Sequence, residues 1–287
     1  MISVLVMTRN EEQDLPGCLA SVSWSDDVHV FDSFSTDATV SIAEGLGAKV
    51  AQRVFDNYAR HRNAALDGTH FRHPWVLLMD ADERCTPALA EEIQRIAEAN
   101  DLNFAAYRMR RRDYFQNTWL RHAPISPWYI RFVRPELARY TREVNEVLEI
   151  AGRVGELRAP LDHFPFSKGI GHWLRKHDVY STMEAQLIVQ GGGEGGGEGG
   201  GAQKPSLRAA FTARDFHERR LHQKALFYRL PGRPLLKWLY MVLVRGAFLD
   251  GRPGLTYARL QAIYEYMIVL KTRELRERAA LGIRSAG

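Results

Sequence analysis

Polar side chains that could do chemistry follow three short apolar runs in the first eighty-three residues of the chain. The polar clusters are residues 8–11 after the run 2–7, residues 32–37 after 28–31, and residues 80–83 after 75–79. Short, continuously apolar runs are typical of buried strands, and ligands of open α/β sheets bind outside the carboxyl ends of the strands. A single cluster could cap a helix. Three of them together predict a binding cleft along one sheet edge.

Asp80 and Asp82 make the sharpest of these clusters. Two carboxylates placed directly after a buried strand are held by rigid backbone at the mouth of the cleft. Mg²⁺ and Mn²⁺ prefer such hard oxygen ligands and keep positions open for phosphate oxygens and water. The competing interpretation is a turn with acidic residues before the helix that Pro87 opens. The strand context and the other two clusters favour a metal site.

The side chains after the first two runs fit a nucleoside pocket, although each could instead cap the helix that follows it. Asp32 can accept a hydrogen bond from a nucleobase N–H or a ribose hydroxyl, whereas Asp37 and Thr39 are better explained as capping residues. The other candidates for the pocket are Thr8, Asn10 and Glu11.

Two arginines near a helix start, Arg60 and Arg62, suit a diphosphate, because guanidinium groups and helix N-termini both bind phosphate. Asn63 follows them in the same segment. The alternative for this segment is an ordinary basic surface turn.

The elements that must position these residues alternate between strand and helix over residues 1–100, which predicts an α/β fold with a mostly parallel sheet covered on both faces. Strand-like pieces at residues 105–110, 128–133 and 139–150 complete the sheet. After Pro165 the sequence is helical, near residues 170–190, 206–229, 234–249 and 254–281. We therefore expect a catalytic domain at 1–165 and a helical module at 166–287. The tract 191–201, GGGEGGGEGGG, has the composition of a flexible linker, native or engineered.

The net charge of +5 is divided unevenly along the chain. Residues 203–287 hold 17 Lys/Arg and 6 Asp/Glu, a net of +11, which leaves −6 for residues 1–202. A basic helical module whose apolar run 235–244 is too short to span a bilayer suits an anionic membrane surface. The alternative is a helical subdomain with a basic outer face. The sequence carries no nucleic-acid-binding signature, so we expect no nucleic-acid partner.

The cysteine content and the N-terminal residues suggest a cellular location. The two cysteines, Cys18 and Cys85, fit a reducing compartment. No signal peptide is evident at the N-terminus, so we expect a cytoplasmic protein, peripheral on the inner face of the cytoplasmic membrane.

In order and spacing, several segments resemble the family 2 glycosyltransferases, in particular the bacterial group that includes lipopolysaccharide-core β-glucosyltransferases. These segments are VLVMTRNEEQDLPGCLASV, VFDSFSTDATVSIAEGLGAKV, NYARHRNAAL and WVLLMDADE, with looser similarity in HWLRKHDVYSTMEA and RGAFLDGRPGLTYARLQAIYEYMIVLKTRE. The resemblance implies a GT-A fold, a nucleoside-diphosphate-sugar donor (most often UDP-linked), a divalent metal ion and an inverting single displacement.

By motif match, the resemblance places the nucleoside against Thr8, Asn10, Glu11 and Asp32, and it gives Asp82 to the metal. Asp80 would face the ribose or the metal. Related sequences have a His-Glu-Val-like element where this chain has residues 144–147, so Glu146 is the candidate general base, although Asn145 replaces the expected histidine. A solvated charge on a β strand is the alternative for Glu146.

Two aromatic residues complete the expected site. His163 matches the late histidine that completes the metal site in many GT-A enzymes, with a structural histidine as the alternative. Trp128 could stack on a sugar or belong to the core.

Arg108, Arg110, Arg111 and Arg112 form a basic run that could meet an anionic acceptor or simply be a solvated strand end.

The sequence thus predicts an inverting, metal-dependent transfer of a hexose from a nucleotide sugar to a glycan or lipid-linked acceptor in bacterial envelope or lipopolysaccharide synthesis. A polyprenyl phosphate acceptor is the first alternative. A non-catalytic nucleotide-binding scaffold at the membrane is the second. A dinucleotide-dependent dehydrogenase is disfavoured, because no Gly-x-Gly-x-x-Gly follows the first strand.

Overall fold

The computed structural model describes residues 1–99, 102–124, 128–141, 147–190, 226–228 and 230–281. The chain divides into two compact units. Unit 1 comprises residues 1–119 and 124–168, and unit 2 comprises residues 120–123 and 169–287. The break after residue 168 lies close to the predicted boundary at 165. The short insertion of residues 120–123 into unit 2 was not predicted, and the roles assigned to the two parts stay predictions.

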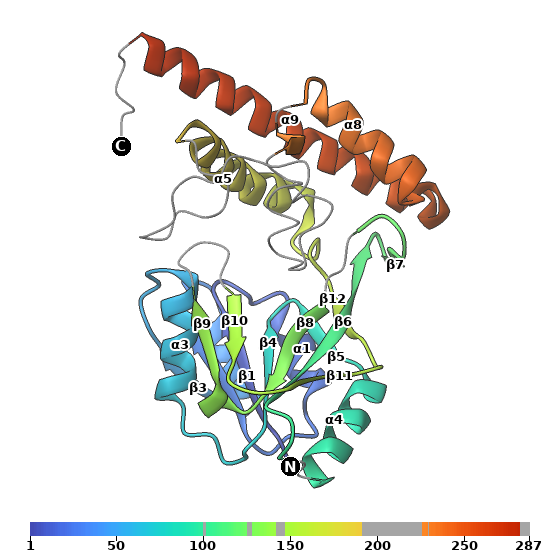
Figure 1. The fold of residues 1–287 in the computed structure, drawn as a ribbon. Coiled ribbons are helices and arrows are strands. Elements are labelled where there is room, and N and C mark those ends of the chain that lie inside the picture. The colour runs from blue at the N-terminus through green and yellow to red at the C-terminus, as the bar shows by residue number, and fades with distance from the viewer. Residues whose placement is uncertain (100–101, 125–127, 142–146, 191–225, 229, 282–287) are drawn as a thin grey trace. The chain divides into compact units, whose positions relative to one another are not determined.

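Unit 1 is built on a ten-stranded mixed sheet (Figure 1). Its main path runs β3-β2-β1-β4-β8-β6-β12-β5, and β7 and β11 pair with β6. The strands are β1 (Ser3–Thr8), β2 (Val28–Asp32), β3 (Lys49–Gln52), β4 (Val76–Asp80), β5 (Glu83–Cys85), β6 (Ala106–Phe115), β7 (Thr118–Trp119), β8 (Trp128–Val133), β11 (Val154–Glu156) and β12 (Leu161–His163). β1 to β4 are parallel, whereas β8 runs antiparallel to both β4 and β6. The predicted α/β fold with a mostly parallel sheet is confirmed.

Both faces of the sheet are covered, which explains why the central strands are continuously apolar. Leu77 and Met79 of β4, together with Trp75 just before it, face one core, while Val76 and Leu78 face the other. The first core is closed by α1 (Leu15–Ser21), α2 (Thr39–Gly45) and α4 (Pro87–Ala99). The second is closed by α3 (Tyr58–Gly68) and the antiparallel pair β9 (Ala138–Thr141) and β10 (Val147–Ile150), with a 3-10 turn, η1 (Pro135–Leu137), before β9.

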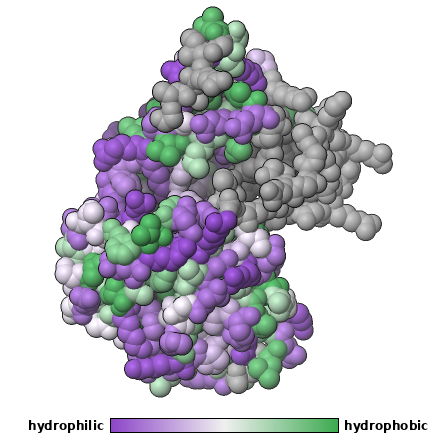
Figure 2. Space-filling model, turned by 90° about the vertical axis from the view of Figure 1, so that its left-hand side faces the viewer, coloured by the Kyte–Doolittle hydropathy of each residue, from purple (hydrophilic) through white to green (hydrophobic). Residues whose placement is uncertain are grey.

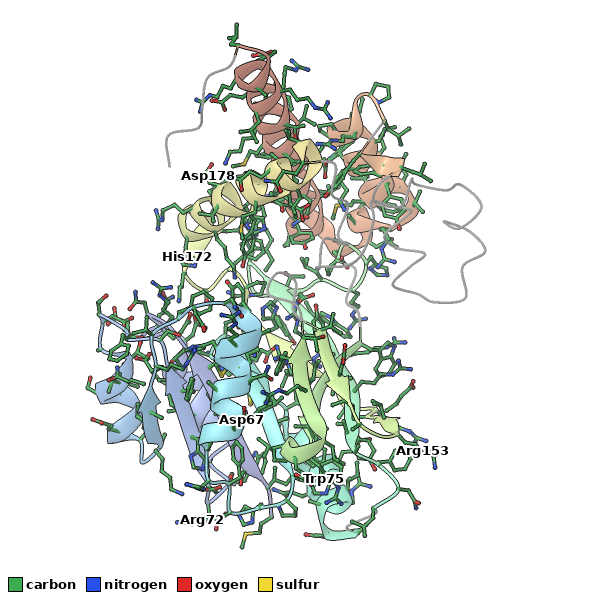
Figure 3. The ribbon with its side chains drawn as sticks, turned by 60° about the vertical axis from the view of Figure 1, so that its left-hand side comes forward. Asp67, Arg72, Trp75, Arg153, His172 and Asp178 are labelled. Atoms are coloured by element: carbon green, nitrogen blue, oxygen red, sulfur yellow. The ribbon has the colours of Figure 1, made fainter. Side chains whose placement is uncertain are left out.

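Trp75 anchors the first core at the amino end of β4 (Figure 3). Its ring is fully buried and stacks on Phe132 of β8, with the ring centroids 4.6 Å apart. This contact joins the parallel half of the sheet to its antiparallel neighbour. It therefore fixes β8, the strand that carries Arg131 to the site described below.

Unit 2 is helical, as predicted. Its long helices are α5 (Gly169–Val189), which carries Asp178 (Figure 3), and α9 (Gly251–Ala280). The Lys271 ammonium of α9 donates a hydrogen bond to Asp178 Oδ1 at 2.6 Å. The predicted single helix at 234–249 is wrong. The chain there forms α8 (Arg233–Leu239), a π-helical turn η2 (Tyr240–Val244) and a 3-10 turn η3 (Ala247–Asp250). The helix ends because Gly246 adopts φ = 72°, a conformation that favours glycine.

The tract 191–201 and most of the predicted helix 206–229 lie outside the described residues. Within the described part of the chain, none of the helices is both long and apolar enough to cross a bilayer. Hydrophilic residues spread over the face drawn in Figure 2, with hydrophobic residues in small groups among them.

Candidate functional site

The three polar clusters meet at one edge of the sheet, as their positions after the apolar runs predict. Thr8 at the end of β1 lies opposite Asp32 at the end of β2, and Met7 lies opposite Asp80 at the end of β4. Because these strands are parallel, their carboxyl ends face the same side. β12 runs parallel to β6 and brings His163 to an adjoining strand end.

Asp32 is completely buried at this edge, and four protein donors fill its carboxylate. Oδ1 accepts hydrogen bonds from Thr8 Oγ1 at 2.9 Å and from Ser35 Oγ. Oδ2 accepts from Ser35 N at 2.8 Å and from Gln52 Nε2 at 2.9 Å. Burial opposes ionisation, but these hydrogen bonds outweigh it and lower the pKa of Asp32. Asp32 thus ties three strand ends together, and its direct contact with a nucleoside stays a prediction.

Asn10 and Glu11 lie in the loop after β1, which is bonded to the loop after β2. Asn10 has φ = 54°, and its side-chain oxygen accepts from Thr36 N at 2.8 Å. Glu11 forms a 2.7 Å ion pair with Lys168 Nζ, while its other carboxylate oxygen is buried without a hydrogen-bond partner. Burial raises the pKa of Glu11 to about 7, against the opposing effect of Lys168. An unsatisfied buried acceptor next to the edge suits a ligand donor.

Asp80 is held by two arginines rather than facing open solvent. Arg62 Nη2 donates to Oδ1 at 2.9 Å, and Arg131 Nη2 donates to Oδ2 at 2.6 Å. Arg131 is buried, and the same nitrogen donates to Oε1 of the fully buried Glu83 at 2.8 Å. Glu83 Oε2 in turn accepts from the Asp80 backbone N–H at 2.9 Å. The two carboxylates and the turn between them are therefore fixed by one guanidinium.

Asp82 belongs to a second group of charges that adjoins the first. Its Oδ2 lies 3.3 Å from His163 Nε2, and His163 Nδ1 lies 2.6 Å from Asp113 Oδ1. Arg111 Nε donates to the same Asp113 oxygen at 3.0 Å, and Arg111 Nη1 lies 3.7 Å from Glu83 Oε1. One continuous chain of alternating charges thus connects Asp82 to Arg62 through these residues. We call it the edge charge chain: Asp82, His163, Asp113, Arg111, Glu83, Arg131, Asp80 and Arg62.

The charges set each other's protonation states. Burial alone would raise the pKa of Asp80, but Arg131 and Arg62 outweigh it and hold that pKa well below its usual range. Burial and the neighbouring Asp80 raise the pKa of Glu83 despite Arg131. Burial opposes protonation of His163, yet its hydrogen bonds to Asp113 and Asp82 raise its pKa to about 9.

A divalent cation fits at Asp82 and His163 if it displaces the proton from His163 Nε2, because the raised pKa keeps the metal-free imidazole protonated. A carboxylate and an imidazole nitrogen 3.3 Å apart can share one ion, and the Asp113 bond to the other ring nitrogen orients the imidazole as metal-site carboxylates do. Among the described residues no group of three or more His, Cys, Asp or Glu side chains could hold a metal. A hard cation with one or two protein ligands completes its shell with phosphate oxygens and water. Asp80 is less suited than predicted, because two arginines hold its oxygens.

Arg84 stabilises the turn that carries Asp82 through hydrogen bonds to its backbone. Its Nη1 donates to the carbonyl oxygens of Ala81 at 2.9 Å and Glu83 at 2.8 Å, and its guanidinium carbon lies 5.5 Å from the Phe164 ring centroid. Gly17 of α1 leaves room for this guanidinium, since a Cβ there would lie 2.6 Å from Arg84 Nε. The Phe164 N–H also donates to Asp82 O at 2.9 Å, which ties the turn to the residue after His163.

The remaining predicted residues are distributed differently. Arg60 lies exposed in the first turn of α3, where Asn57 Oδ1 accepts from its N–H. Asn63 Nδ2 donates to the Tyr140 carbonyl oxygen and Asn63 Oδ1 accepts from the Tyr140 N–H, both at 2.8 Å, so Asn63 joins α3 to β9. Trp128 is half-buried under the Arg108 and Arg110 guanidiniums. Glu146 lies outside the described residues. The donor, base and metal roles of all these residues stay predictions.

Comparison with known proteins decides the family. The sequence model of glycosyl transferase family 2 matches residues 3–159, more than half of the chain. The chain belongs to this family.

Relatives agree with this assignment. A lipopolysaccharide core biosynthesis glycosyltransferase of Rhizobium meliloti is 24% identical over 286 residues, which cover 94% of this chain and 91% of that protein. An uncharacterised glycosyltransferase of Rickettsia bellii is 38% identical over 111 residues, which span 38% of this chain and only 37% of that protein. The transferase also shares its fold with a mannosyltransferase of Pyrobaculum calidifontis solved with GDP-mannose and Mn²⁺, at a TM-score of 0.52, 16% identity and coverage of 94% and 86% of the two chains. The fold is of the GT-A type, and the chain is a glycosyltransferase.

Three members of the edge charge chain of this glycosyltransferase, Glu83, Arg131 and Asp113, were not predicted as site residues, and Arg111 was expected only as part of a basic run that could meet an acceptor. Glu83 directly follows the Asp80-Ala81-Asp82 triplet, so its position was visible in the sequence. Arg111, Asp113 and Arg131 lie 28, 30 and 48 residues beyond Glu83, and only the pairing of β8 and β12 with β6 brings them to the edge. The one available signal was charge inside otherwise strand-like segments, where an unpaired buried charge would be costly.

Arg131→Met tests the chain's central pair. The substitution leaves Asp80 and Glu83 close together without their shared cation. Breaking a buried pair by removing one partner typically costs about 3–5 kcal/mol. At roughly 2–4 °C per kcal/mol for a domain of this size, we expect Tm to fall by about 10 °C.

The matched control for this variant is Arg139→Met, which removes an exposed pair with Asp67 and should change stability by less than about 1 kcal/mol. Thermal unfolding of both variants is the measurement. Equal Tm values for the two variants would contradict the structural role of Arg131.

Gly17→Ala tests the support of the Asp82 turn. Alanine normally stabilises a helix relative to glycine, by about 0.5–1 kcal/mol. At position 17, however, the new methyl group would overlap Arg84 and force it off the turn. We expect a lower Tm together with weaker Mn²⁺ binding.

Gly45→Ala, in α2 with nothing within 4 Å of a new Cβ, is the matched helical control and should be neutral or stabilising. Thermal unfolding and a Mn²⁺ titration provide the comparison. If Gly17→Ala behaved like Gly45→Ala in both, Arg84 would not be the support we describe.

Proposed function

We propose that this glycosyltransferase moves a hexose from a nucleoside-diphosphate sugar, UDP-linked, to a glycan or lipid-linked acceptor of the bacterial envelope. The transfer is metal-dependent and inverts the configuration at the sugar C1. The observation that carries the proposal is the edge charge chain. It presents Asp82 and His163 at the carboxyl ends of the strands, and it pairs Asp80 and Glu83 with the buried Arg131. This arrangement suits binding of a diphosphate.

Asp82 and His163 would hold the divalent ion, which supplies positive charge to the departing diphosphate. The protein's own contribution is to aim these two ligands. Asp113 fixes the His163 ring, and Arg84 fixes the turn that carries Asp82. Arg131 keeps Asp80 and Glu83 from repelling each other beside the ion.

The diphosphate would also meet the start of α3. Arg60 lies in its first turn, and the helix N-terminus adds a partial positive charge. Arg62, two residues further on, already reaches the edge through Asp80. On the nucleoside side, Thr8, Asn10, Glu11 and Asp32 form one hydrogen-bonded wall, in which the orphan oxygen of Glu11 is the acceptor best placed for a ligand N–H or hydroxyl.

In a single displacement, the acceptor oxygen forms a bond to the sugar C1 as the bond from C1 to the diphosphate oxygen breaks. The electron pair of the broken bond leaves with the diphosphate, and a general base takes the proton of the acceptor hydroxyl. We assign that base to Glu146 on the motif match given above. The similarity to a lipopolysaccharide core biosynthesis glycosyltransferase of Rhizobium meliloti supports the proposed acceptor class. The proposed place of action is the cytoplasmic face of the inner membrane.

A thermal-shift panel tests the donor. UDP, GDP, CDP and dTDP sugars would each be added with Mn²⁺ or with EDTA to the wild type and to Asp82→Ala. A ligand at 100 times its Kd stabilises the native state by about 2.7 kcal/mol, or about 5–10 °C at roughly 2–4 °C per kcal/mol. We expect UDP sugars to give this shift only with Mn²⁺ and only in the wild type.

The control variant is Asp67→Ala, which removes an exposed carboxylate of α3 and should respond as the wild type does. A shift that ignores both Mn²⁺ and Asp82 would refute metal-dependent donor binding. A shift with GDP sugars alone would refute UDP.

A further inference from the structure

One segment of unit 2 exposes an unusual number of large apolar side chains. Within residues 235–249, two lie more than two-thirds exposed, Leu243 at 67% and Val244 at 72%. Five more are exposed in the same segment. We call the set the apolar face: Leu235, Leu236, Tyr240, Leu243, Val244, Phe248 and Leu249. Scattered apolar residues are normal on a surface, but seven within fifteen residues mark an interaction site.

The local backbone explains why these side chains are exposed together. Met241, Val242 and Ala247 are buried and pack with Ala258 of α9. Gly254 lets α9 approach closely, since a Cβ there would lie 2.2 Å from Ala247 O. With one side of η2 and η3 used in this way, the remaining apolar residues must point outwards.

Hydrogen bonds and an ion pair hold both ends of the segment that carries the apolar face. Asp250 closes η3 and accepts hydrogen bonds from the backbone N–H groups of Arg121, His122 and Ala123, at 2.8–3.0 Å. Arg233 begins α8 and is buried against Glu265 of α9, with Nε 2.9 Å from Oε1. Both ends of the segment are therefore tied to unit 2, so the exposed face is a built surface.

Charge selects the occupant of this surface. Residues 203–287 carry a net charge of +11, and the described stretch 230–281 has 9 Lys/Arg against 4 Asp/Glu. A self-association surface of that charge would repel its copy, whereas anionic lipid headgroups attract it. An apolar face in a basic module, whose described helices are too short or too polar to cross a bilayer, is typical of an element that lies in the membrane interface.

We infer that the apolar face inserts into the headgroup region of an anionic bilayer. This inference rests on the proposed function, because a lipid-linked acceptor lies at such a surface, and it names the residues that bring the enzyme there. The side chains of Leu243, Val244 and Phe248 enter the interface, while basic residues of unit 2 meet the lipid phosphates.

Vesicle flotation of the full chain tests the inference. The vesicles are phosphatidylcholine alone, or phosphatidylcholine with a third phosphatidylglycerol. We expect the wild type to float with the anionic vesicles, and binding to weaken at 0.5 M salt, where the Debye length falls to a few ångströms. The double variant Leu243→Glu/Phe248→Glu should bind the anionic vesicles at least about tenfold more weakly than the wild type, because it removes apolar contact and adds charge repulsion.

The matched control, Leu46→Glu/Leu102→Glu, alters two exposed leucines of unit 1 and should float as the wild type does. A milder variant, Leu243→Ser/Val244→Ser, covers the case in which the glutamates disturb folding, which thermal unfolding reports. Wild-type protein that stays with the soluble fraction, or variants that float equally well, would overturn the inference. So would a wild-type dimer in analytical ultracentrifugation that the double variant abolishes, since the face would then bind a second copy.

Failure here is distinguishable from failure of the proposed donor. The apolar-face variants should keep the wild-type thermal shift with nucleotide sugar and Mn²⁺. If the protein floats but no nucleotide sugar shifts its Tm, the membrane inference stands and the donor proposal is refuted. If a nucleotide sugar shifts the Tm but the protein does not float, the donor proposal stands and the membrane inference is refuted.

Discussion

The site depends on one buried guanidinium. Arg131 lies between Asp80 and Glu83, at 2.6 and 2.8 Å, and both Arg131 and Glu83 are buried, whereas Asp80 is partly exposed at the sheet edge. Two such carboxylates cannot both ionise next to each other unless a cation is shared between them. Because Glu83 also accepts the Asp80 backbone N–H, this one cation fixes the turn from β4 to β5. Asp82 occupies the middle of that turn.

The two aspartates of the triplet therefore have different tasks. Asp80 is turned into the protein by Arg62 and Arg131, and it organises the edge. Asp82 faces His163, whose other nitrogen is held by Asp113, and it is the carboxylate that fits a cation. Asp32 and Glu11, on the side where we propose that the nucleoside binds, differ in the same way. Asp32 is saturated with protein donors, whereas Glu11 keeps an acceptor oxygen without a partner.

Local pattern predicted the fold well, because short apolar runs and cap residues determine strands and helices over a few residues. It also predicted that the three clusters share one edge, since parallel strands leave no other arrangement. Partners from distant strands escaped prediction. Arg131 and Asp113 reach the edge only through the register of β8 and β6, which no local pattern records. The helix predicted at 234–249 failed for a related reason, since Gly246 ends it at φ = 72° in favour of packing against α9.

The central claim is that Asp82 and His163 together hold the divalent ion that the diphosphate needs. Electron paramagnetic resonance of free Mn²⁺, titrated with enzyme in the presence of UDP, measures this directly. The account predicts that the wild type depletes the free Mn²⁺ signal, and that Asp82→Asn and His163→Ala each weaken Mn²⁺ binding about tenfold or more. Asp67→Asn should bind as the wild type does. Equal Mn²⁺ affinity in the wild type and both site variants would contradict the account and return Asp82 to the role of a turn residue.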